Sequence, residues 1–285
     1  MNRTRVVRVP ASSANLGPGY DVLAAALAIH LELEVEETGE FSVEAPDRDG
    51  IPLDRSNLCV RAFETLHSAD GMTFRLRSDI PLAAGLGSSA AAIVAGLVAA
   101  DHMYELDADL LPRAIELEGH PDNVAAALRG GFVICADDGA ERFDPPPELE
   151  GVLAIPPHEV PTSEARAALP AEVPIADAVH NVAHASLLVL GLARADFDLV
   201  ARGLSDAIHQ PRRRSLYPRS MELVERARGL GALGATISGA GPAVLFWSHF
   251  EQTGALLDAL RSEAPDCEVR RVQFEPSGAD VRALA

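Results

Sequence analysis

The sequence predicts an α+β fold with two domains, and two observations support that prediction. Segments in which apolar and polar residues alternate, as in strands, occur throughout the 285 residues beside helical segments rich in alanine and leucine. Around residues 138–150 the sequence becomes polar and proline-rich (DDGAERFDPPPELEG), which is typical of a domain boundary. We therefore predict one domain at 1–148 and a second at 149–285.

The elements of the first half follow from periodicity. Apolar and acidic residues alternate in LELEVEE (31–37), which indicates a strand with one solvent-exposed face. Similar patterns predict strands at 4–10, 41–45 and 73–78, and the apolar run FVICAD predicts a buried strand at 132–137. Helices are predicted at 90–106 and at 110–119, the second of which ends at Gly119.

The second half alternates strands and helices in an order that suits helices packed on one face of an antiparallel sheet. Strands are predicted at 152–157, 234–238, 243–247 and 267–274. Helices are predicted at 162–169, 175–194, 196–209, 220–229 and 250–264.

Composition and charge exclude several classes of protein. The formal net charge is −18 and all 24 basic residues are arginine, which argues against nucleic acid as a partner. Either a salty cytoplasm or a high-GC genome accounts for this composition. No apolar run approaches the ~20 residues of a membrane span. Three widely spaced cysteines argue against a disulfide framework or zinc site, and we expect a cytoplasmic protein.

The segment PLAAGLGSSAAAIVAG (81–96) carries no charged side chain, so any ligand must be held by its backbone and hydroxyl groups. A glycine-rich turn that opens a helix leaves backbone N–H groups unpaired, and these groups bind phosphate. Gly85 and Gly87 permit close approach of the backbone, and Ser88 or Ser89 offers a hydroxyl to magnesium. The alternative is that the small residues only allow tight helix packing.

Two other nucleotide motifs fit this segment poorly. GLGSSA satisfies the dinucleotide pattern G-x-G-x-x-A, but it follows several strands, and the next acid, Asp101, lies at the far end of the helix. A chain without lysine has no nucleoside-triphosphate P-loop. Two further glycine-rich segments, SSANLGPGYD (12–21) and SGAGPA (238–243), and the segment EGHPDN (118–123) make a packing role alone hard to accept.

In combination and in this order, VPASSANLGPGYD (9–21), PLAAGLGSSAA (81–91) and SGAGPA (238–243) resemble the three motifs of the GHMP kinases, a family of small-molecule kinases. Within that family the first motif and EGHPDNVAAALRGGF (118–132) are most similar to the branch that phosphorylates homoserine. The similarity continues through SNLCVRAF (56–63), PTSEARAALP (161–170) and HQPRRRSLYP (209–218), so it covers most of the chain.

The resemblance implies a fold, an activity and partners. The fold would have an N-terminal α/β domain with a left-over-right mixed sheet and a C-terminal ferredoxin-like α+β domain. The activity would be ATP-dependent phosphorylation of the L-homoserine hydroxyl, a step toward threonine, with Mg²⁺ as cofactor. Family members are commonly homodimers. A kinase for another small alcohol, such as shikimate or mevalonate, and a non-catalytic ligand sensor on the same fold are the alternatives.

The resemblance also assigns site residues. The ATP-binding set is Asn57, Pro81, Leu82, Ala83, Ala84, Gly85, Leu86, Gly87, Ser88, Ser89, Ala90, Ser238, Gly239, Ala240 and Gly241. The substrate-binding set is Asn15, Asp21, His120, Asn123, Thr162, Arg166 and Arg213, of which Asn15 and Asn123 are also assigned to catalysis. Ser89 and Glu118 would bind magnesium, with Glu116 as the second choice to Glu118.

Each assignment has a structural alternative. Asp21, which would pair with the substrate ammonium, could instead cap a helix that begins at Val22. Arg166 and Arg213 would bind the substrate carboxylate. In HQPRRR, Arg212 or Arg214 could take this role in place of Arg213, or the whole triplet could be a solvated basic cluster.

Two further positions bear on the chemistry. The asparagine amide at position 123 cannot accept a proton, so we expect the hydroxyl proton to pass to the γ-phosphate directly or through water, with the adjacent Asp122 as the alternative base. His180 and His184 lie four residues apart on a predicted helix, but no third metal ligand is apparent, and we interpret the pair as structural.

Overall fold

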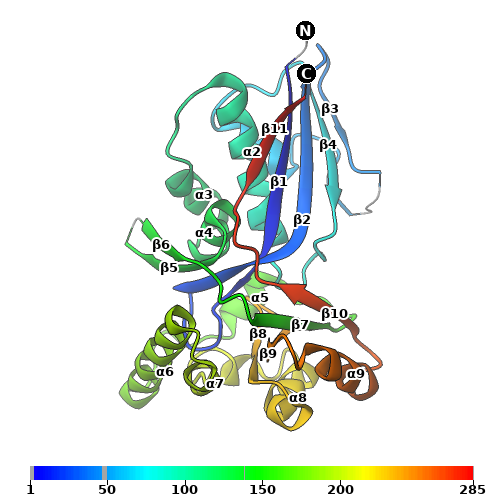
Figure 1. Ribbon diagram of the computed structural model, residues 1–285. Coiled ribbons are helices and arrows are strands. Elements are labelled where there is room, and N and C mark those ends of the chain that lie inside the picture. The colour runs from blue at the N-terminus through cyan, green and yellow to red at the C-terminus, as the bar shows by residue number, and fades with distance from the viewer. Residues whose placement is uncertain (1–2, 47–49, 138, 285) are drawn as a thin grey trace.

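The computed structural model describes residues 3–46, 50–137 and 139–284, and it has the predicted α+β architecture (Figure 1). Residues 1, 2 and 285, at the outer limits of the two predicted domains, and residue 138, in the predicted linker, lie outside the described residues. Two lobes stack one above the other, each consisting of a sheet and its helices. The N- and C-terminal ends lie together at the top of the first lobe.

The first lobe contains a mixed sheet in the order β11–β1–β2–β4–β3, extended by β5 on β2 and β6 on β5. Among the described strands of this sheet, only β3 pairs in parallel, with β4. Its strands are β1 (Thr4–Ala14), β2 (Leu23–Glu37), β3 (Ser42–Glu44), β4 (Met72–Ser78), β5 (Phe132–Ala136), β6 (Gly139–Phe143) and β11 (Asp280–Leu284).

The predicted strand 31–37 covers only the second half of β2. The prediction missed the first half because it is an uninterrupted apolar run without alternation. The second half of β2 pairs with β4, and its first three residues pair with β5. The register with β1 shifts at Pro10/Ala11, and the two strands bend toward the second lobe (Figure 1). This bend carries the loop after β1 into the space between the lobes.

Four helices cover one face of the first sheet: α1 (Leu58–Glu64), α2 (Ser88–Tyr104), α3 (Leu110–Glu118) and α4 (Asp122–Arg129). Helix α2 is central and packs on β1, β2 and the other three helices. A Cβ on Gly96 would lie 2.1 Å from the carbonyl oxygen of Cys59, so this glycine is what allows α1 and α2 to approach. The buried face of α2 fixes where its N-terminus points.

The second lobe contains the antiparallel sheet β10–β7–β9–β8, formed by β7 (Leu149–Ile155), β8 (Gly234–Ile237), β9 (Val244–His249) and β10 (Glu268–Gln273). Helices α8 (Pro218–Arg226) and α9 (Thr253–Glu263), with the 3₁₀ turn η2 (Ala227–Leu230), pack on this sheet. Helices α6 (Ile175–Arg194) and α7 (Phe197–Gly203) form a pair beside it, and α5 (Thr162–Ala167) and the turn η1 (Pro211–Arg213) lie at the junction of the lobes.

The predicted helix 196–209 is wrong beyond Gly203, where α7 ends. The carboxylate of Asp206 accepts hydrogen bonds from the backbone N–H groups of Ile208, His209 and Gln210, and from the side-chain amide of Asn181. These bonds replace a helical pattern and order a loop that leads into η1.

The chain passes from the first sheet to the second between Phe143 and Leu149, at the predicted boundary. Part of the polar stretch there is strand β6, which the sequence did not predict. Strand β11 returns to the first sheet and pairs with β1. We therefore retain the division at 148/149 as a proposal, with β11 as a C-terminal addition to the first lobe.

Within the described residues, one helix, α6, is long and apolar enough to cross a bilayer when judged only by length and composition, so the prediction that no segment approaches that length is corrected. This helix packs along α7, and Asn181 in its first half donates a hydrogen bond to the carbonyl of Pro18. Ile175, Val179 and Val182 on its outer face are exposed.

Candidate functional site

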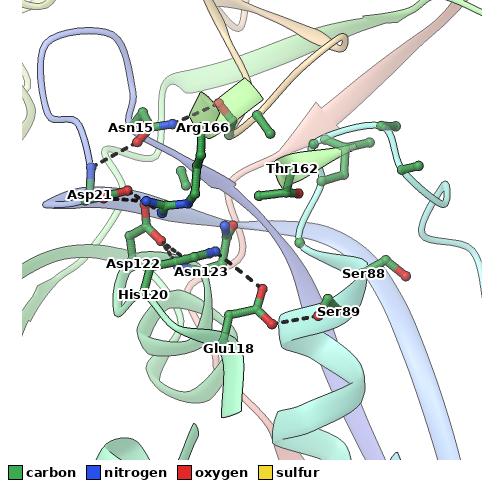
Figure 2. A pocket seen from close by; sticks show the side chains of 18 of the residues that line it. Asn15, Asp21, Ser88, Ser89, Glu118, His120, Asp122, Asn123, Thr162 and Arg166 are labelled. Atoms are coloured by element: carbon green, nitrogen blue, oxygen red, sulfur yellow. Dashed lines mark hydrogen bonds and ion pairs between the residues drawn. The ribbon is translucent and has the colours of Figure 1, made fainter. Parts of the chain in front are cut away.

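An open cleft of about 650 Å³ lies between the two lobes (Figure 2). Six described segments form it: the loop after β1, the loop before α2, the turn between α3 and α4, helix α5, the turn that carries Arg213 and the turn that carries Gly239. The residues that line it are Ala14, Asn15, Tyr20, Asp21, Pro81, Ala83, Ala84, Gly85, Leu86, Gly87, Ser88, Ser89, Glu118, His120, Asp122, Asn123, Thr162, Arg166, Arg213, Gly239 and Ala240.

The glycine-rich loop ends at Gly87, which is the N-cap of α2 and has φ 69°. No side chain caps this helix, so the N–H groups of its first turn face the cleft at the positive end of the helix dipole. A Cβ on Gly87 would lie 2.1 Å from Oγ of Ser12, so only glycine fits between β1 and α2 here. The small residues therefore allow close packing and also leave a helix end whose unpaired N–H groups suit an anion.

The loop 238–241 supports the first glycine loop from behind. Ser238 Oγ donates to the carbonyl of Gly85 at 2.7 Å, and the N–H of Ala243 donates to the carbonyl of Ala84 at 3.1 Å. Of the four residues in this loop that were assigned to ATP, Gly239 and Ala240 line the cleft, whereas Ser238 and Gly241 do not.

Ser89 Oγ donates a hydrogen bond of 2.6 Å to Oε2 of Glu118, which is the last residue of α3 (Figure 2). Burial raises the pKa of the Glu118 carboxyl, and the hydrogen bond from Ser89 opposes that rise. Glu116 does not line the cleft. In the part of the chain that the structure describes, no group of three or more His, Cys, Asp and Glu side chains is placed to hold a metal ion.

The segment after α3 forms a polar network (Figure 2). Nδ1 of His120 donates to Oδ1 of Asp122 at 2.8 Å, and Nε2 of His120 lies 3.7 Å from Oε1 of Glu118. Burial lowers the pKa of His120, but the hydrogen bond to Asp122 and the charges of both acids outweigh it, so the net pKa is raised. Asp122 was predicted only as an alternative base, yet it is buried and lines the cleft.

Ser12, which the sequence analysis did not assign, orients Asn123. Its hydroxyl donates to Oδ1 of Asn123 at 2.8 Å, so the amide oxygen faces β1 and the NH₂ group remains available to a ligand. The two residues are 111 positions apart. The motif SSAN contains a signal for this contact: its two adjacent serines lie on opposite faces of β1, so they face different neighbours.

At the other end of the cleft, Asp21 and Arg166 bind each other. Nη2 of Arg166 lies 2.8 Å from Oδ1 of Asp21, and Nη1 lies 3.0 Å from Oδ2, which makes a forked pair. Nη1 also donates to the hydroxyl of Tyr20 at 3.1 Å. Asp21 begins no helix: β2 starts at Leu23, so the helix-capping alternative is wrong.

The arginine triplet resolves into three different environments. Arg213 is buried and lines the cleft, where its Nε donates to the carbonyl of Ala165 at 2.8 Å. Arg212 bonds Asp177 and two backbone carbonyls, and Arg214 forms an exposed ion pair with Glu225. Neither Arg212 nor Arg214 lines the cleft.

Asn15 lines the cleft, but both ends of its amide hold the loop. Nδ2 donates to the carbonyl of Gly239 at 2.8 Å, and Oδ1 accepts from the N–H of Asp21 at 3.0 Å (Figure 2). Asn15 itself has φ 69°, a conformation that asparagine tolerates better than most residues. Thr162, at the start of α5, lines the cleft.

A second, mainly apolar pocket of about 770 Å³ adjoins the glycine loop, and it shares Ala83, Ser88 and Ser89 with the cleft. Its other lining residues are Leu31, Gly50, Ile51, Pro52, Asn57, Leu58, Leu76, Ser78, Leu82 and Ala92. The side chain of Asn57 caps α1 and donates to the carbonyl of Pro52. Leu82, which was assigned to ATP, lines this pocket and not the cleft. Ala90, which was also assigned to ATP, is fully buried and lines neither of them. Sequence reasoning missed the apolar members because they carry no motif.

His180 and His184 stack with their ring centroids 3.8 Å apart on α6. His180 Nε2 bonds Ser205 Oγ, and His184 Nδ1 bonds the carbonyl of His180. One ring nitrogen of each histidine is thus hydrogen-bonded within the fold, which agrees with the structural interpretation.

Two family models match the chain. The model of the GHMP kinases N-terminal domain matches residues 57–131, and the model of the GHMP kinases C-terminal domain matches residues 188–266. Among curated proteins, the homoserine kinase of Moorella thermoacetica is 37% identical, covering 94% of this chain and 96% of its own length. The homoserine kinase of Deinococcus radiodurans is 41% identical over 85% of this chain and 84% of its own length.

Solved structures give the same result. The crystal structure of homoserine kinase from Cytophaga hutchinsonii matches with a TM-score of 0.87 and 30% identity, covering 98% of this chain and 97% of that one. A crystal structure of mevalonate kinase, at 14% identity and a TM-score of 0.74 over 95% of this chain and 99% of that one, shows that the fold is shared more widely.

Proposed function

This chain belongs to the GHMP kinases and, within them, to the homoserine kinase family, and from that premise we propose that it transfers the γ-phosphoryl group of ATP to the side-chain hydroxyl of L-homoserine. One observation supports this proposal most strongly. A single cleft carries an anion-binding helix end and, across from it, an acid and two arginines suited to an amino acid zwitterion.

The donor nucleotide would occupy the glycine loop and the adjoining apolar pocket. The uncapped N–H groups at the start of α2 are suited to phosphate oxygens because they are unpaired donors at the positive end of a helix dipole. The apolar pocket beside Ser88 and Ser89 has the character that a nucleobase requires. Ser238 and Gly241 then contribute indirectly, by holding the loop in place.

Ser89 and Glu118 fit a magnesium ion. One hydroxyl and one carboxylate are hard oxygen ligands, and Mg²⁺ usually takes its remaining ligands from water and phosphates. When bound there, the ion would neutralise charge on the transferred phosphoryl group. Burial raises the pKa of Glu118, which indicates a carboxylate that gains from a cation.

The acceptor end explains why a zwitterion is the preferred substrate. Asp21 and Arg166 satisfy each other's charge as a forked pair. An amino acid offers an ammonium group to Asp21 and a carboxylate to Arg166 and Arg213, so no charge is left unpaired when the pair opens. An alcohol that carries only a carboxylate would leave Asp21 without a partner, which costs binding free energy.

The transfer itself requires positioning more than covalent chemistry by the protein. Asn123, with its NH₂ group available, and His120 would hold the reacting hydroxyl and the γ-phosphate oxygens. As the hydroxyl oxygen forms its bond to phosphorus and the bond to ADP breaks, the hydroxyl proton passes to a γ-phosphate oxygen directly or through water. Asp122 would orient His120 and Asn123 through its two hydrogen bonds.

The test is magnesium-dependent ADP release over a panel of L-homoserine, shikimate and mevalonate. We expect stimulation by L-homoserine alone and loss of that stimulation when EDTA removes the metal. Stimulation by shikimate or mevalonate would replace this proposal with another GHMP kinase activity. No stimulation by any of the three would favour the ligand sensor.

The Asp122→Asn variant tests the path of the proton. Asparagine retains an oxygen to accept from His120 but cannot act as a base, so we expect slower but measurable turnover. Turnover that vanished while both substrates still bound would show that Asp122 is the base.

We also propose that the protein is a cytoplasmic homodimer without a membrane or nucleic-acid partner. The charge of −18 and the resemblance to homodimeric kinases support this, and a second copy would cover the exposed apolar side chains of α6. Light scattering at micromolar concentration should give twice the chain mass of 30.1 kDa.

A further inference from the structure

Tyr20 lies close to both arginines of the acceptor end. Its ring centroid lies 5.8 Å from Cζ of Arg166 and 5.4 Å from Cζ of Arg213. Its hydroxyl accepts a hydrogen bond of 3.1 Å from Nη1 of Arg166. Tyr20 also lines the cleft, so one aromatic side chain contacts both guanidinium groups at the place where they reach the ligand space.

Two guanidinium groups directed at one small cavity repel each other. Asp21 neutralises Arg166, but Arg213 is buried and has no carboxylate partner in the described part of the chain, where its bonds go to Ala165, His209 and Gly239. The negative face of an aromatic ring stabilises nearby cations, most of all where water is excluded. Tyr20 can therefore offset part of this repulsion for both arginines.

The side chain of His209 packs against the ring of Tyr20. The imidazole of His209 lies 5.5 Å from it, centroid to centroid, and is fully buried. Because arginine only donates, Nδ1 of His209 accepts from Nη1 of Arg213 at 3.3 Å, and Nε2 donates to the carbonyl of Gly17 at 2.8 Å. Burial lowers the pKa of His209, which agrees with this neutral form. The tyrosine ring thus packs against a fixed partner.

The hydroxyl of Tyr20 becomes important when the substrate binds. Arg166 has two hydrogen bonds to Asp21 and one to Tyr20. When Asp21 turns to the ammonium group of a substrate, the bond to Tyr20 is the one that still holds the guanidinium at the cleft. Burial and the charge of Asp21 raise the pKa of Tyr20, so its phenol stays protonated.

We propose that Tyr20 is a positioning residue for the acceptor's carboxylate: its ring and hydroxyl hold Arg166 and Arg213 in a convergent arrangement that favours acceptors carrying a carboxylate. This proposal rests on the proposed phosphorylation of L-homoserine. It assigns no contact with the reacting atoms to Tyr20.

The experiment compares two acceptors, L-homoserine and L-homoserinol, in which a hydroxymethyl group replaces the carboxylate. The measured quantity is the ratio of kcat/KM for the two acceptors, in the wild type and in the Tyr20→Phe and Tyr20→Leu variants. Phenylalanine keeps the ring and removes the hydroxyl, whereas leucine removes both. Tyr104→Phe is the matched control, because its hydroxyl contacts only the sulfur of Met72 in the described structure, away from the cleft.

We expect Tyr20→Leu to lower the preference for L-homoserine by about tenfold, through a higher KM for that acceptor with kcat and the KM for ATP nearly unchanged. Tyr20→Phe should lower the preference by a smaller factor, about threefold to fivefold, because it removes the hydrogen bond to Arg166 and keeps the ring. Tyr104→Phe should retain the whole preference. For L-homoserinol, which has no carboxylate to bind, neither Tyr20 variant should change kcat/KM by more than about twofold.

Two results would overturn the assignment of Tyr20 while leaving the kinase activity intact. One is an equal loss of kcat/KM for both acceptors in Tyr20→Leu, which would indicate a general structural role. The other is an unchanged preference in both variants. A wild-type protein that did not phosphorylate L-homoserine would instead defeat the proposed function, and the role of Tyr20 with it.

Discussion

The orientation of the Asn123 side chain in the cleft depends on the hydrogen bond from Ser12. Ser12 and Ser13 are adjacent in β1, but they differ in environment. Ser12 donates to Asn123, whereas the Ser13 hydroxyl is buried and has no hydrogen-bond partner among the described residues. Since both are fully buried serines of the same strand, they form a natural pair in which the effect of one hydrogen bond can be measured.

Ser12→Ala should lower kcat about fivefold with little change in either KM, because a neutral hydrogen bond contributes about 1 kcal/mol and its loss lets the Asn123 amide rotate. Steady-state kinetics with both substrates varied would measure this. Ser13→Ala is the control and should keep the wild-type kcat. If the two variants behaved alike, the orientation of Asn123 by Ser12 would be refuted.

Among the elements, the pair β7–β10 has an ion pair added to its ladder. Glu150 on β7 lies opposite Gln273, and Arg271, two residues along β10 on the same face, bonds the Glu150 carboxylate. Burial alone would raise the pKa of Glu150, but hydrogen bonds from Arg271, Thr253 and Gln273 and the charge of Arg271 together outweigh it and hold the pKa below its ordinary value. Glu150 therefore favours the folded state in its ionised form.

Glu150→Gln should lower the free energy of unfolding at pH 7 by about 1 kcal/mol, a modest value because half of Arg271 is exposed to screening solvent. A carboxyl whose pKa is depressed by folding stabilises the protein above its unfolded pKa of about 4.3, and that contribution is lost as the pH falls through the folded pKa. The difference between variant and wild type should thus shrink below about pH 4.

Urea denaturation at pH 7, 5 and 3.5 would measure this trend. The control is Glu268→Gln, because Glu268 is exposed and lies 3.5 Å from Arg270 on its own strand. It should change stability by less than about 0.5 kcal/mol at any pH. A Glu150→Gln difference that stayed constant with pH would contradict the assigned role of its charge.

For the molecule as a whole, the two lobes meet where the glycine loop of the first rests on the loop 238–241 of the second. A Cβ on Gly85 would lie 2.2 Å from the carbonyl oxygen of Ser238, and Gly85 has φ 79°. This backbone contact, with the hydrogen bond from Ser238 Oγ, sets the width of the cleft. Both lobes must therefore fold for the site to exist.

Gly85→Ala should destabilise the protein by about 3 kcal/mol or more and reduce kcat/KM to near background, because the lobes must separate to admit the methyl group. Thermal unfolding and the homoserine assay would measure the two effects. Gly231→Ala is the matched control: φ is 96°, and no heavy atom of the described chain would lie within 4 Å of the new Cβ. It should cost about 1 kcal/mol of backbone strain and leave activity intact.

Local features of the sequence were enough for much of the fold. Strands with strict alternation and helices with long alanine-rich runs are confirmed, because side-chain periodicity is set by residues close in sequence. The early part of β2 lacks alternation, and the helix end at Gly203 depends on Asp206, so these were missed or misjudged. Strand β11 was missed because its partner β1 is at the other end of the chain.

The sequence by itself determined the chemistry available to this protein: glycine loops whose backbone N–H groups suit anions, and an acid, arginines and asparagines suited to an amino acid acceptor. Only the tertiary structure decided that Arg213 and neither neighbour reaches the cleft, that Asp21 pairs with Arg166 from 145 positions away, and that Tyr20 lies within 6 Å of both arginines. The physical reason is that backbone preference acts over a few residues, whereas convergence of charged groups depends on how both lobes pack.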